Sequence, residues 1–336
     1  MSRGLLTLGA VLLTVVAAVA ACAPRVDRPG PVVSRPVLED ATMRTADGAL
    51  APVRRWLPAA GAVKAAVIAL HGFNDYGNFF AQPGAYLARL GIAAYAFDQR
   101  GFGEAQGRGI WPGVKAYADD LKTMADLVRA RHPGVPLYLL GASMGGAVVM
   151  VAMTDDDPPA VDGIILSAPA VWGRKTMPFY QRWALAIAAH TVPWLTVTGR
   201  GLKIRASDNI EMLRALGRDP LVIKETRIDT IYGLSNLMDR ALAAAPALRS
   251  RALILYGRND EVIPADPVRR MIESLPADSR ARRRFAYYDA GYHMLLRDLQ
   301  GETVWRDIAA WIEDAEAPLP SGADTNARLS APPPLR

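Results

Sequence analysis

The chain has 336 residues, of which 51% are apolar and 21% are charged, and these ordinary globular proportions exclude wholesale disorder. Its single cysteine excludes an intrachain disulfide framework and any cysteine-rich zinc or iron–sulfur site. The 39 Lys and Arg residues exceed the 33 Asp and Glu residues, giving a net charge of +6. This charge suits an anionic membrane surface or a nucleic acid, so the position of the basic residues must decide between them.

Residues 1–21 have the pattern of an export signal. Arg3 precedes an apolar stretch that ends in small residues, and the next charge along the chain is Arg25. A transmembrane helix is the alternative interpretation, because the apolar stretch is just long enough to span a bilayer. The residues that end the stretch favour the export signal.

The only cysteine lies at the end of this stretch. Val19-Ala20-Ala21-Cys22 resembles the lipobox of bacterial lipoproteins, which implies cleavage before Cys22 and acylation of its thiol and of the new amino terminus. Several acyl chains would hold the protein firmly on a membrane. The resemblance also implies the bacterial cell envelope, and its outer membrane where there is one, because Ala23 rather than Asp follows the cysteine. A small buried cysteine is the alternative role.

Pro-rich segments flank the remainder of the chain. Residues 22–36 combine many prolines with little apolar patterning, which predicts an extended tether. Residues 316–336 have a similar composition and are predicted to be a disordered tail. Residues 37–315 are therefore expected to form one folded domain.

The sequence of this domain alternates between strand and helix patterns. A hairpin is expected within Ala41–Arg55, which contains Asp47-Gly48, and helices over Val114–Arg131 and Gly145–Met153. Six short apolar runs are typical of buried parallel strands: Ala65–Leu70, Ile92–Phe97, Leu137–Leu140, Gly163–Ser167, Ala252–Tyr256 and Arg284–Tyr288. This alternation predicts an α/β fold with a mostly parallel, doubly wound sheet, whose ligand sites lie beyond the carboxyl ends of the strands.

The first candidate site follows the run Leu137–Leu140, where the chain reads Gly141-Ala142-Ser143-Met144-Gly145-Gly146. This G-x-S-x-G pattern lies between a predicted strand and a predicted helix, and so sharp a turn lifts a serine hydroxyl out of the sheet. Glycines two residues before and after the serine let the neighbouring backbone approach without a clash. The context favours Ser143 as a nucleophile over the alternative of an ordinary tight turn.

A serine nucleophile needs a base that accepts its proton near neutral pH, and the chain has four histidines. The order expected in this topology is serine, acid, histidine, and of the four only His190 and His293 follow Ser143. His190 lies in an Ala-rich stretch, whereas His293 follows the predicted strand Arg284–Tyr288. His293 is therefore the predicted base.

The histidine in turn needs a carboxylate that holds its tautomer and stabilises its cation. Asp260 lies just beyond the predicted strand Ala252–Tyr256 and is the candidate acid. Two carboxylates remain as alternatives. Glu261 is its neighbour on the same turn, and Asp289 lies four residues before His293.

The oxyanion that forms during acyl transfer needs preorganised backbone N–H donors. One donor is expected to be the N–H of Met144, the residue after the nucleophile. The loop after Ala65–Leu70 should supply the other, and we assign it to Phe73. The alternative for His71-Gly72 in this loop is a plain turn with a capping histidine.

Five motifs follow one another along the chain: His71-Gly72-Phe73-Asn74-Asp75, Asp98-Gln99-Arg100-Gly101-Phe102-Gly103, Gly141-Ala142-Ser143-Met144-Gly145-Gly146, Gly257-Arg258-Asn259-Asp260 and Gly291-Tyr292-His293. In this order they resemble the α/β-hydrolase superfamily, specifically its monoacylglycerol lipase and lysophospholipase branch, the serine aminopeptidase-like hydrolases. The resemblance covers about Val37–Ala315 and implies that the second motif is a structural turn. It implies a catalytic triad of Ser143, Asp260 and His293, with oxyanion donors Phe73 and Met144.

The stretch between the predicted strands Gly163–Ser167 and Ala252–Tyr256 is far longer than a crossover helix requires. The surplus, about residues 171–235, contains three of the chain's seven tryptophans. The family resemblance implies that this insertion caps the nucleophile. An aromatic cap suits an acyl chain, and its outer face suits a bilayer. The alternative is that these aromatic residues hold the cap to the core.

The resemblance and the predicted anchor together imply a membrane-anchored serine esterase that cleaves acyl esters of the monoacylglycerol or lysophospholipid type. An aminopeptidase-like serine hydrolase is one alternative, and it would need a carboxylate in the pocket to hold the substrate's ammonium group. A catalytically silent envelope lipoprotein is another, since fold does not imply function. No metal or other cofactor is expected. Nucleic acid is not an expected partner, because no stretch interleaves basic and aromatic residues. The sequence leaves the oligomeric state open.

Overall fold

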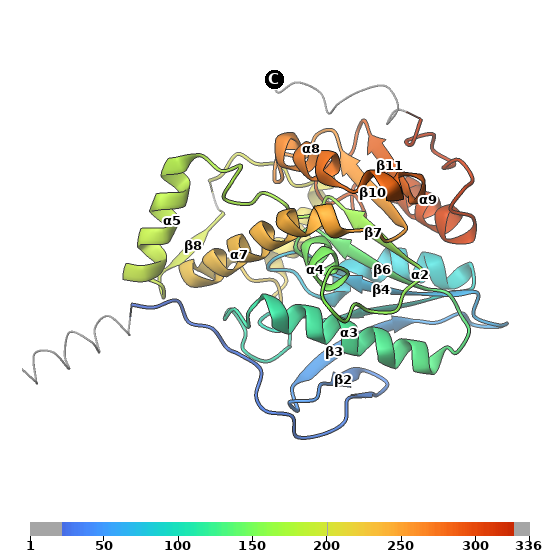
Figure 1. The fold of residues 1–336 in the computed structure, drawn as a ribbon, viewed down its shortest axis with the longest axis horizontal. Coiled ribbons are helices and arrows are strands. Elements are labelled where there is room, and N and C mark those ends of the chain that lie inside the picture. Colours follow the sequence, from blue (N-terminus) through green and yellow to red (C-terminus); the bar gives the residue numbers. More distant parts are fainter. Residues whose placement is uncertain (1–21, 200, 326–336) are drawn as a thin grey trace, which may run out of the picture.

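The computed structural model describes residues 22–199 and 201–325, and its centre is a sheet of nine strands (Figure 1). In order across the sheet, the strands are β1 (Val37–Leu38), β2 (Thr42–Arg44), β3 (Leu50–Trp56), β5 (Ile92–Phe97), β4 (Ala65–Leu70), β6 (Leu137–Ala142), β7 (Gly163–Ser167), β10 (Ala252–Gly257) and β11 (Arg283–Tyr288). The six strands from β5 to β11 run parallel, and β1, β2 and β3 add antiparallel pairs at one edge. The predicted α/β fold with a mostly parallel sheet is confirmed.

The six parallel strands coincide with the six predicted apolar runs, because both faces of this part of the sheet are buried. On β4, Ile68 and Leu70 belong to the hydrophobic cluster on one face. Their neighbours Val67 and Ala69 belong to the cluster on the other face. The inner strands therefore need apolar residues at every position rather than at alternate positions, whereas the edge strand β11 begins with two partly buried arginines.

Helices cover both faces of the sheet (Figure 1). One face packs against α3 (Val114–Arg131), α4 (Met144–Ala152), α7 (Ile228–Ala244) and α8 (Ala265–Ser274), and the other against α2 (Ala81–Arg89) and α9 (Gly301–Glu313). Short 3₁₀ turns occupy Gly77–Phe80, Ala245–Ala247 and Ala277–Arg282. β5 lies on one side of β4 and β6 on the other, so the strand order reverses there. The loops after β4 and β6 therefore meet at the crevice where doubly wound sheets bind ligands.

A buried group of charges joins the hairpin to the rest of the domain. β2 and β3 form the predicted hairpin, with Gly48 in the left-handed region at φ 81°. Arg100, in the turn after β5, binds Asp47 of the hairpin at 2.8 Å and Asp120 of α3 at 2.7 Å. Hydrogen bonding to the Arg100 guanidinium holds the pKa of Asp47 well below its ordinary value.

Replacing Arg100 by methionine is expected to lower the free energy of unfolding by roughly 3–5 kcal/mol, because two largely buried carboxylates lose their partner. The stabilisation that Asp47 contributes is present above its unfolded pKa of about 4 and is lost as the pH falls through its folded pKa. The difference between wild type and variant should therefore shrink at acid pH. Urea denaturation at several pH values measures it. The control is Arg214→Met, since Arg214 pairs with the exposed Glu211, and an equal loss in both variants would contradict the prediction.

The Pro-rich segment of residues 22–36 is extended, but it lies against the domain rather than away from it. The Arg25 N–H donates to a carboxylate oxygen of Asp229, at the start of α7, at 3.2 Å. Val26 forms a parallel backbone bridge with Trp111. From Arg25 onward, therefore, the predicted tether is held on the domain.

The start of the predicted disordered tail packs on the domain, so that prediction is wrong for residues 316–325. Leu319 and Ala323 are buried, and the Tyr287 N–H donates to the Ala323 carbonyl at 3.1 Å. β11 is an edge strand, and its free backbone groups can pair with any segment that lies beside it. Composition alone does not reveal this pairing. Residues 326–336 lie outside the described part of the chain.

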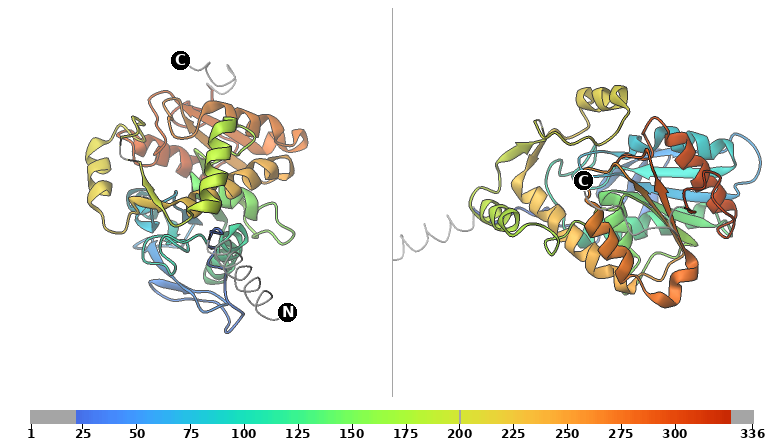
Figure 2. Two further views of the ribbon diagram at one scale, coloured as in Figure 1. Left: turned by 90° about the vertical axis from the view of Figure 1, so that its left-hand side faces the viewer. Right: turned by 90° about the horizontal axis from the view of Figure 1, so that it is seen from above.

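The insertion after β7 forms a cap at one end of the molecule, with its outer helices clear of the sheet (Figures 1 and 2). It contains α5 (Phe179–Thr191), β8 (Thr196–Thr198), α6 (Ile210–Arg218) and β9 (Glu225–Arg227), and β8 pairs with β9. The predicted end of the cap near residue 235 falls inside α7. This helix starts in the cap and continues into the core, where Leu237, Met238 and Ala241 are buried.

The outer face of the cap is apolar. Large exposed side chains extend from α5 and the turn after it: Phe179, Tyr180, Trp183, Ile187, Trp194 and Leu195. Trp183 is 65% exposed, whereas Trp172 packs against the core. Trp172 therefore helps to hold the cap to the core, as the alternative interpretation expected, whereas Trp183 does not. An exposed apolar surface of this kind marks an interaction site.

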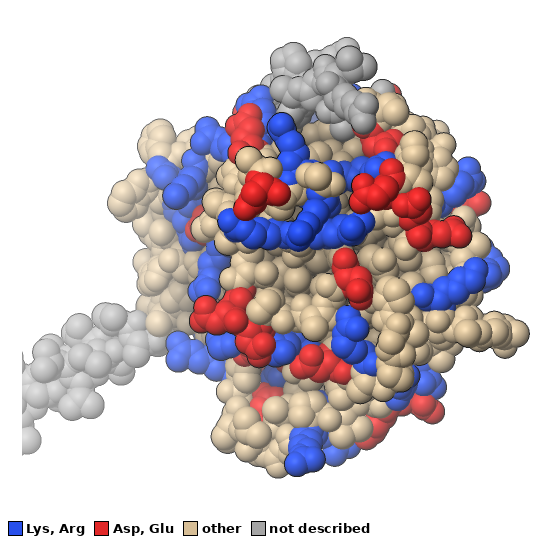
Figure 3. Space-filling model, turned by 45° about the vertical axis from the view of Figure 1, so that its right-hand side comes forward, with Lys and Arg blue, Asp and Glu red and all other residues tan. Residues whose placement is uncertain are grey.

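No helix within residues 22–199 and 201–325 is both long and apolar enough to cross a membrane. The predicted export signal, residues 1–21, lies outside these ranges. On the face shown in Figure 3, Lys and Arg side chains lie among Asp and Glu side chains, so acidic residues partly offset the positive charge there.

Candidate active site

Ser143 lies in a strained turn between β6 and α4. Its backbone is in the left-handed region, with φ 51° and ψ −114°, which is costly for any residue other than glycine. A Cβ atom on Gly145 would lie 2.3 Å from the Leu70 carbonyl oxygen, and one on Gly141 would lie 2.5 Å from the backbone of Gly145. The two flanking glycines of the motif are therefore required by close backbone packing, which holds Ser143 at the carboxyl end of β6.

His293 and Asp260 come together at the ends of neighbouring strands. The Nδ1 atom of His293 lies 2.8 Å from Oδ2 of Asp260. The other carboxylate oxygen accepts hydrogen bonds from the N–H groups of Val262 at 2.8 Å and Ile263 at 2.9 Å. The Asp260 side chain is fully buried, and that of His293 is 9% exposed. These bonds orient the carboxylate so that one oxygen faces the imidazole.

The two alternative acids face elsewhere. The Glu261 carboxylate accepts a hydrogen bond from the Arg205 N–H at 2.7 Å. Asp289 is 72% exposed and forms an ion pair with Arg258 at 2.5 Å. Of the three carboxylates that the sequence left open, Asp260 is the one that contacts His293.

The other histidines have structural surroundings. His71 is fully buried, with Nδ1 2.8 Å from the Gly72 carbonyl oxygen and Nε2 accepting from the Gln99 N–H at 3.0 Å. Burial lowers the pKa of His71, which keeps its ring neutral. The ring thereby braces the loop after β4 against the turn after β5. His132 ends α3 and bonds with a tyrosine, and His190 is exposed on α5.

The second motif forms a structural turn, as the resemblance implied. Asp98 is fully buried and accepts hydrogen bonds from Arg54 at 2.7 Å and from the Gly77 N–H at 2.8 Å. Its other oxygen accepts from the Glu104 N–H at 3.0 Å. This carboxylate orders the loops behind the candidate site and does not line the cavity.

Two backbone N–H groups beside Ser143 are available to a ligand. Met144 is the first residue of α4, so its N–H has no acceptor one turn earlier, and it lies at the positive end of the helix dipole. The Phe73 N–H likewise has no partner within the described part of the chain. The two loops lie close together, since a Cβ atom on Gly72 would lie 3.3 Å from that of Ser143. An oxyanion site requires two such donors that point to one position, and the closeness of the two loops is compatible with this requirement.

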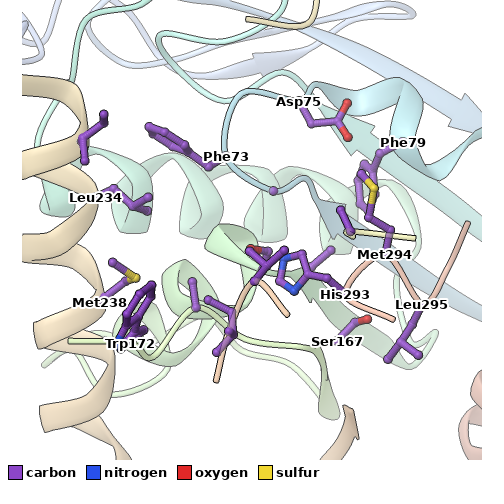
Figure 4. A pocket seen from close by; sticks show the side chains of 18 of the residues that line it. Phe73, Asp75, Phe79, Ser167, Trp172, Leu234, Met238, His293, Met294 and Leu295 are labelled. Atoms are coloured by element: carbon purple, nitrogen blue, oxygen red, sulfur yellow. The ribbon is translucent and has the colours of Figure 1, made fainter. Parts of the chain in front are cut away.

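A cavity of about 600 Å³ opens onto Ser143 and His293 (Figure 4). Its walls are mostly apolar and come from both the domain and the cap. Leu234 and Met238 on α7 face the cavity near Trp172, while Asp75 lies on the opposite side near Phe79 (Figure 4). The Asp75 carboxylate is paired with Arg297, which also lines the cavity.

Sequence reasoning missed the pair of Asp75 and Arg297. Asp75 belongs to the first motif and follows Phe73 by two residues, while Arg297 follows His293 by four. The spacing along the chain contains no signal that these two residues meet.

Within the described ranges, no group of three or more His, Cys, Asp or Glu side chains is arranged to hold a metal ion.

Residues 61–300, more than half of the chain, match the family described as serine aminopeptidase, S33. The chain is 26% identical over 273 residues to the monoglyceride lipase of Rattus norvegicus, covering 80% of this chain and 88% of the rat protein. It is 23% identical over 251 residues to the monoacylglycerol lipase of Mycolicibacterium smegmatis, covering 73% of this chain and 87% of that relative.

Solved structures agree in fold. A soluble variant of the monoglyceride lipase from Saccharomyces cerevisiae, in complex with a substrate analog, has a TM-score of 0.69 at 21% identity, over 86% of this chain and 99% of its own. The monoacylglycerol lipase of Paleococcus ferrophilus has a TM-score of 0.64 at 22% identity, over 78% of this chain and 98% of its own. The chain belongs to the serine aminopeptidase S33 family of α/β-hydrolases, in its monoacylglycerol lipase branch.

Proposed function

We propose that this carboxylic-ester hydrolase cleaves acyl lipids of the monoacylglycerol or lysophospholipid type through an acyl-enzyme on Ser143. The observation that carries the proposal is the buried pair of His293 and Asp260, whose histidine lines the same apolar cavity as Ser143. A base oriented by a carboxylate beside a strained serine is the arrangement that activates a hydroxyl for acyl transfer.

In the proposed mechanism, His293 Nε2 takes the proton of Ser143 while Oγ attacks the ester carbonyl carbon. The Phe73 and Met144 N–H groups stabilise the negative charge on the carbonyl oxygen. The protonated His293 then donates its proton to the leaving alcohol oxygen, and the carbonyl–oxygen bond breaks. Water, deprotonated by the same histidine, attacks the acyl carbon; the bond from this carbon to Ser143 Oγ breaks, His293 returns the proton to Oγ, and the fatty acid is released. Asp260 holds the Nδ1–H throughout and stabilises the imidazolium.

The cavity supports an acyl substrate. Apart from the paired Asp75 and Arg297, the residues that line the cavity are mostly apolar. Burying a hydrocarbon chain against them would contribute a favourable free energy of about 25 cal/mol for each Å² of apolar surface removed from water. The rat and mycobacterial relatives are named as lipases of monoglycerides or monoacylglycerols. The apolar lining and these names favour the same class of substrate.

The aminopeptidase alternative needs a free carboxylate near the nucleophile. Asp75 is the one acidic side chain among the described residues that line the cavity, and Arg297 already neutralises it. A substrate ammonium group would have to displace this guanidinium. Ester hydrolysis is therefore the reaction that the site favours.

A substrate panel tests the proposal. We expect monoacylglycerols and lysophospholipids to be hydrolysed with kcat/KM well above that for aminoacyl-nitroanilides, and a fluorophosphonate probe to label the wild type but not Ser143→Ala. Preference for the nitroanilides would favour the peptidase. Absence of labelling together with absence of turnover would support the catalytically silent lipoprotein.

We also propose that Cys22 is acylated and holds the enzyme on the bacterial envelope, at the outer membrane where there is one. Arg25, three residues after Cys22, is bonded to Asp229 at the start of α7. An anchor at Cys22 would thus lie close to the cap rather than at a variable distance. The apolar outer face of the cap, which includes Trp183, would then be held near the lipid headgroups.

Replacing Cys22 by serine in the full chain is expected to move the protein from the membrane fraction to the soluble fraction and to abolish incorporation of labelled palmitate. The reason is that the serine hydroxyl does not replace the thiol in the acylation. Ser143→Ala is the control, because loss of hydrolysis should leave the protein on the membrane. Retention of Cys22→Ser on the membrane after lysis would contradict the proposal.

A further inference from the structure

A segment of the cap is hydrogen-bonded to the loop that carries His293. This segment, Arg205–Asn209, lies between β8 and α6. The Met294 N–H donates to the Ala206 carbonyl at 2.9 Å. The Asn209 side-chain amide donates to the Arg297 carbonyl at 3.0 Å. The cap therefore contacts the histidine loop through the residue that directly follows His293.

The residue that directly precedes His293 is also linked to this segment, through a buried carboxylate. Asp298 is 8% exposed and accepts the Ser207 hydroxyl at 2.6 Å with one oxygen. Its other oxygen accepts the Tyr292 N–H at 2.7 Å. Ser207 is fully buried. Asp298 thus bridges the cap and the backbone beside the histidine.

Both N–H groups that flank His293 therefore have acceptors that depend on the cap segment. The Met294 N–H uses a cap carbonyl directly, and the Tyr292 N–H uses a carboxylate whose second oxygen is held by Ser207. Burial raises the pKa of Asp298, because the buried carboxylate is poorly solvated. For the same reason, the loss of a hydrogen-bond donor to this carboxylate is costly. Neither Ser207 nor Asp298 lines the cavity, so neither is available to bind substrate.

We infer that the hydrogen bond between Ser207 and Asp298 positions His293, so that the base is aligned for proton transfer when the cap segment Arg205–Asn209 is docked. Ser207 and Asp298 are positioning residues that act through Tyr292. The inference rests on the proposed role of His293 as the general base. It makes the cap part of the catalytic machinery in addition to its role as a wall of the cavity.

Ser207→Ala tests the inference, because it removes the hydroxyl without adding volume. We expect kcat to fall by about 10- to 100-fold, the effect of a catalytic group displaced by a fraction of an ångström to one ångström, with KM changed less than about twofold. The loss should be the same for p-nitrophenyl acetate and for a long-chain monoacylglycerol, because proton transfer is common to both. A role of the cap in substrate binding alone would spare the short ester.

Ser321→Ala is the matched control. Ser321 also donates its hydroxyl to a buried carboxylate, that of Asp307 on α9, outside the cavity. Ser321 is itself exposed, so Ser321→Ala should cost no more thermal stability than Ser207→Ala, and it should keep the wild-type kcat. Ser207→Thr, which retains a hydroxyl, should recover most of the activity.

Two results would overturn the inference: kinetics of Ser207→Ala equal to those of Ser321→Ala, or a loss confined to the long-chain substrate. His293→Ala separates this failure from failure of the proposed function. An inactive His293→Ala with an unaffected Ser207→Ala refutes the positioning role alone. An active His293→Ala refutes the proposed mechanism itself.

Discussion

Replacing Ser143 by alanine is expected to lower kcat for a monoacylglycerol by roughly 10⁶-fold, and His293→Ala by a similar factor. The serine and the histidine act as one unit, since the hydroxyl attacks only as its proton leaves. The double variant should therefore be about as active as either single variant rather than far less active. Steady-state kinetics with purified protein measure all three, and titration with a fluorophosphonate gives the fraction of active wild-type sites.

The control for the histidine is His190→Ala. His190 is exposed on α5, where its ring contacts the Ala186 carbonyl and Tyr232 of α7. Neither His190 nor Tyr232 lines the cavity, so the loss of His190 should change kcat less than about twofold. Multiplicative losses in the double variant of Ser143 and His293 would contradict a concerted role. A comparable loss in His190→Ala would contradict the choice of base.

Replacing Asp260 by asparagine is expected to lower kcat by roughly 10⁴-fold with the fold intact. The N–H groups of Val262 and Ile263 both donate to Oδ1, so the asparagine carbonyl oxygen should occupy that position. Its amide N–H₂ then faces His293 Nδ1, which must accept a hydrogen bond in place of donating one. The proton moves to Nε2, and the imidazole can no longer accept the proton of Ser143.

Asp289→Asn is the matched control for this substitution. Asp289 lies in the loop before His293 but is exposed and paired with Arg258, so its neutralisation should change kcat less than about twofold. Circular dichroism melting shows whether each variant is folded. A large loss in Asp289→Asn, with little effect of Asp260→Asn, would reverse the assignment of the acid.

Local sequence patterns predicted the elements of the fold well. The apolar runs matched the six parallel strands to within two residues at each end, since the inner strands are buried on both faces and must be apolar at every position. The predicted helix Val114–Arg131 has the bounds that the structure shows. The glycines around Ser143 marked the sharp turn for an equally local reason, because side chains at those positions would collide with the backbone of β4 or α4.

Patterns that depend on distant partners were predicted less well. The composition of residues 316–325 resembles that of a disordered segment, yet the edge of β11 binds it. The Pro-rich residues 22–36 are held by Trp111 and by Asp229, far along the chain. The boundary of the cap was misplaced because α7 is apolar both where it lines the cavity and where it enters the core.

The sequence by itself determined the family, the order of the strands along the chain and the positions of Ser143 and His293, because these depend on short motifs at strand ends. The tertiary structure decided among Asp260, Glu261 and Asp289, since the direction of a carboxylate depends on the N–H groups that surround it. It also revealed the cavity and the contacts of the cap with the histidine loop. Such contacts join residues up to about 90 positions apart, and no local pattern encodes a pairing over that distance.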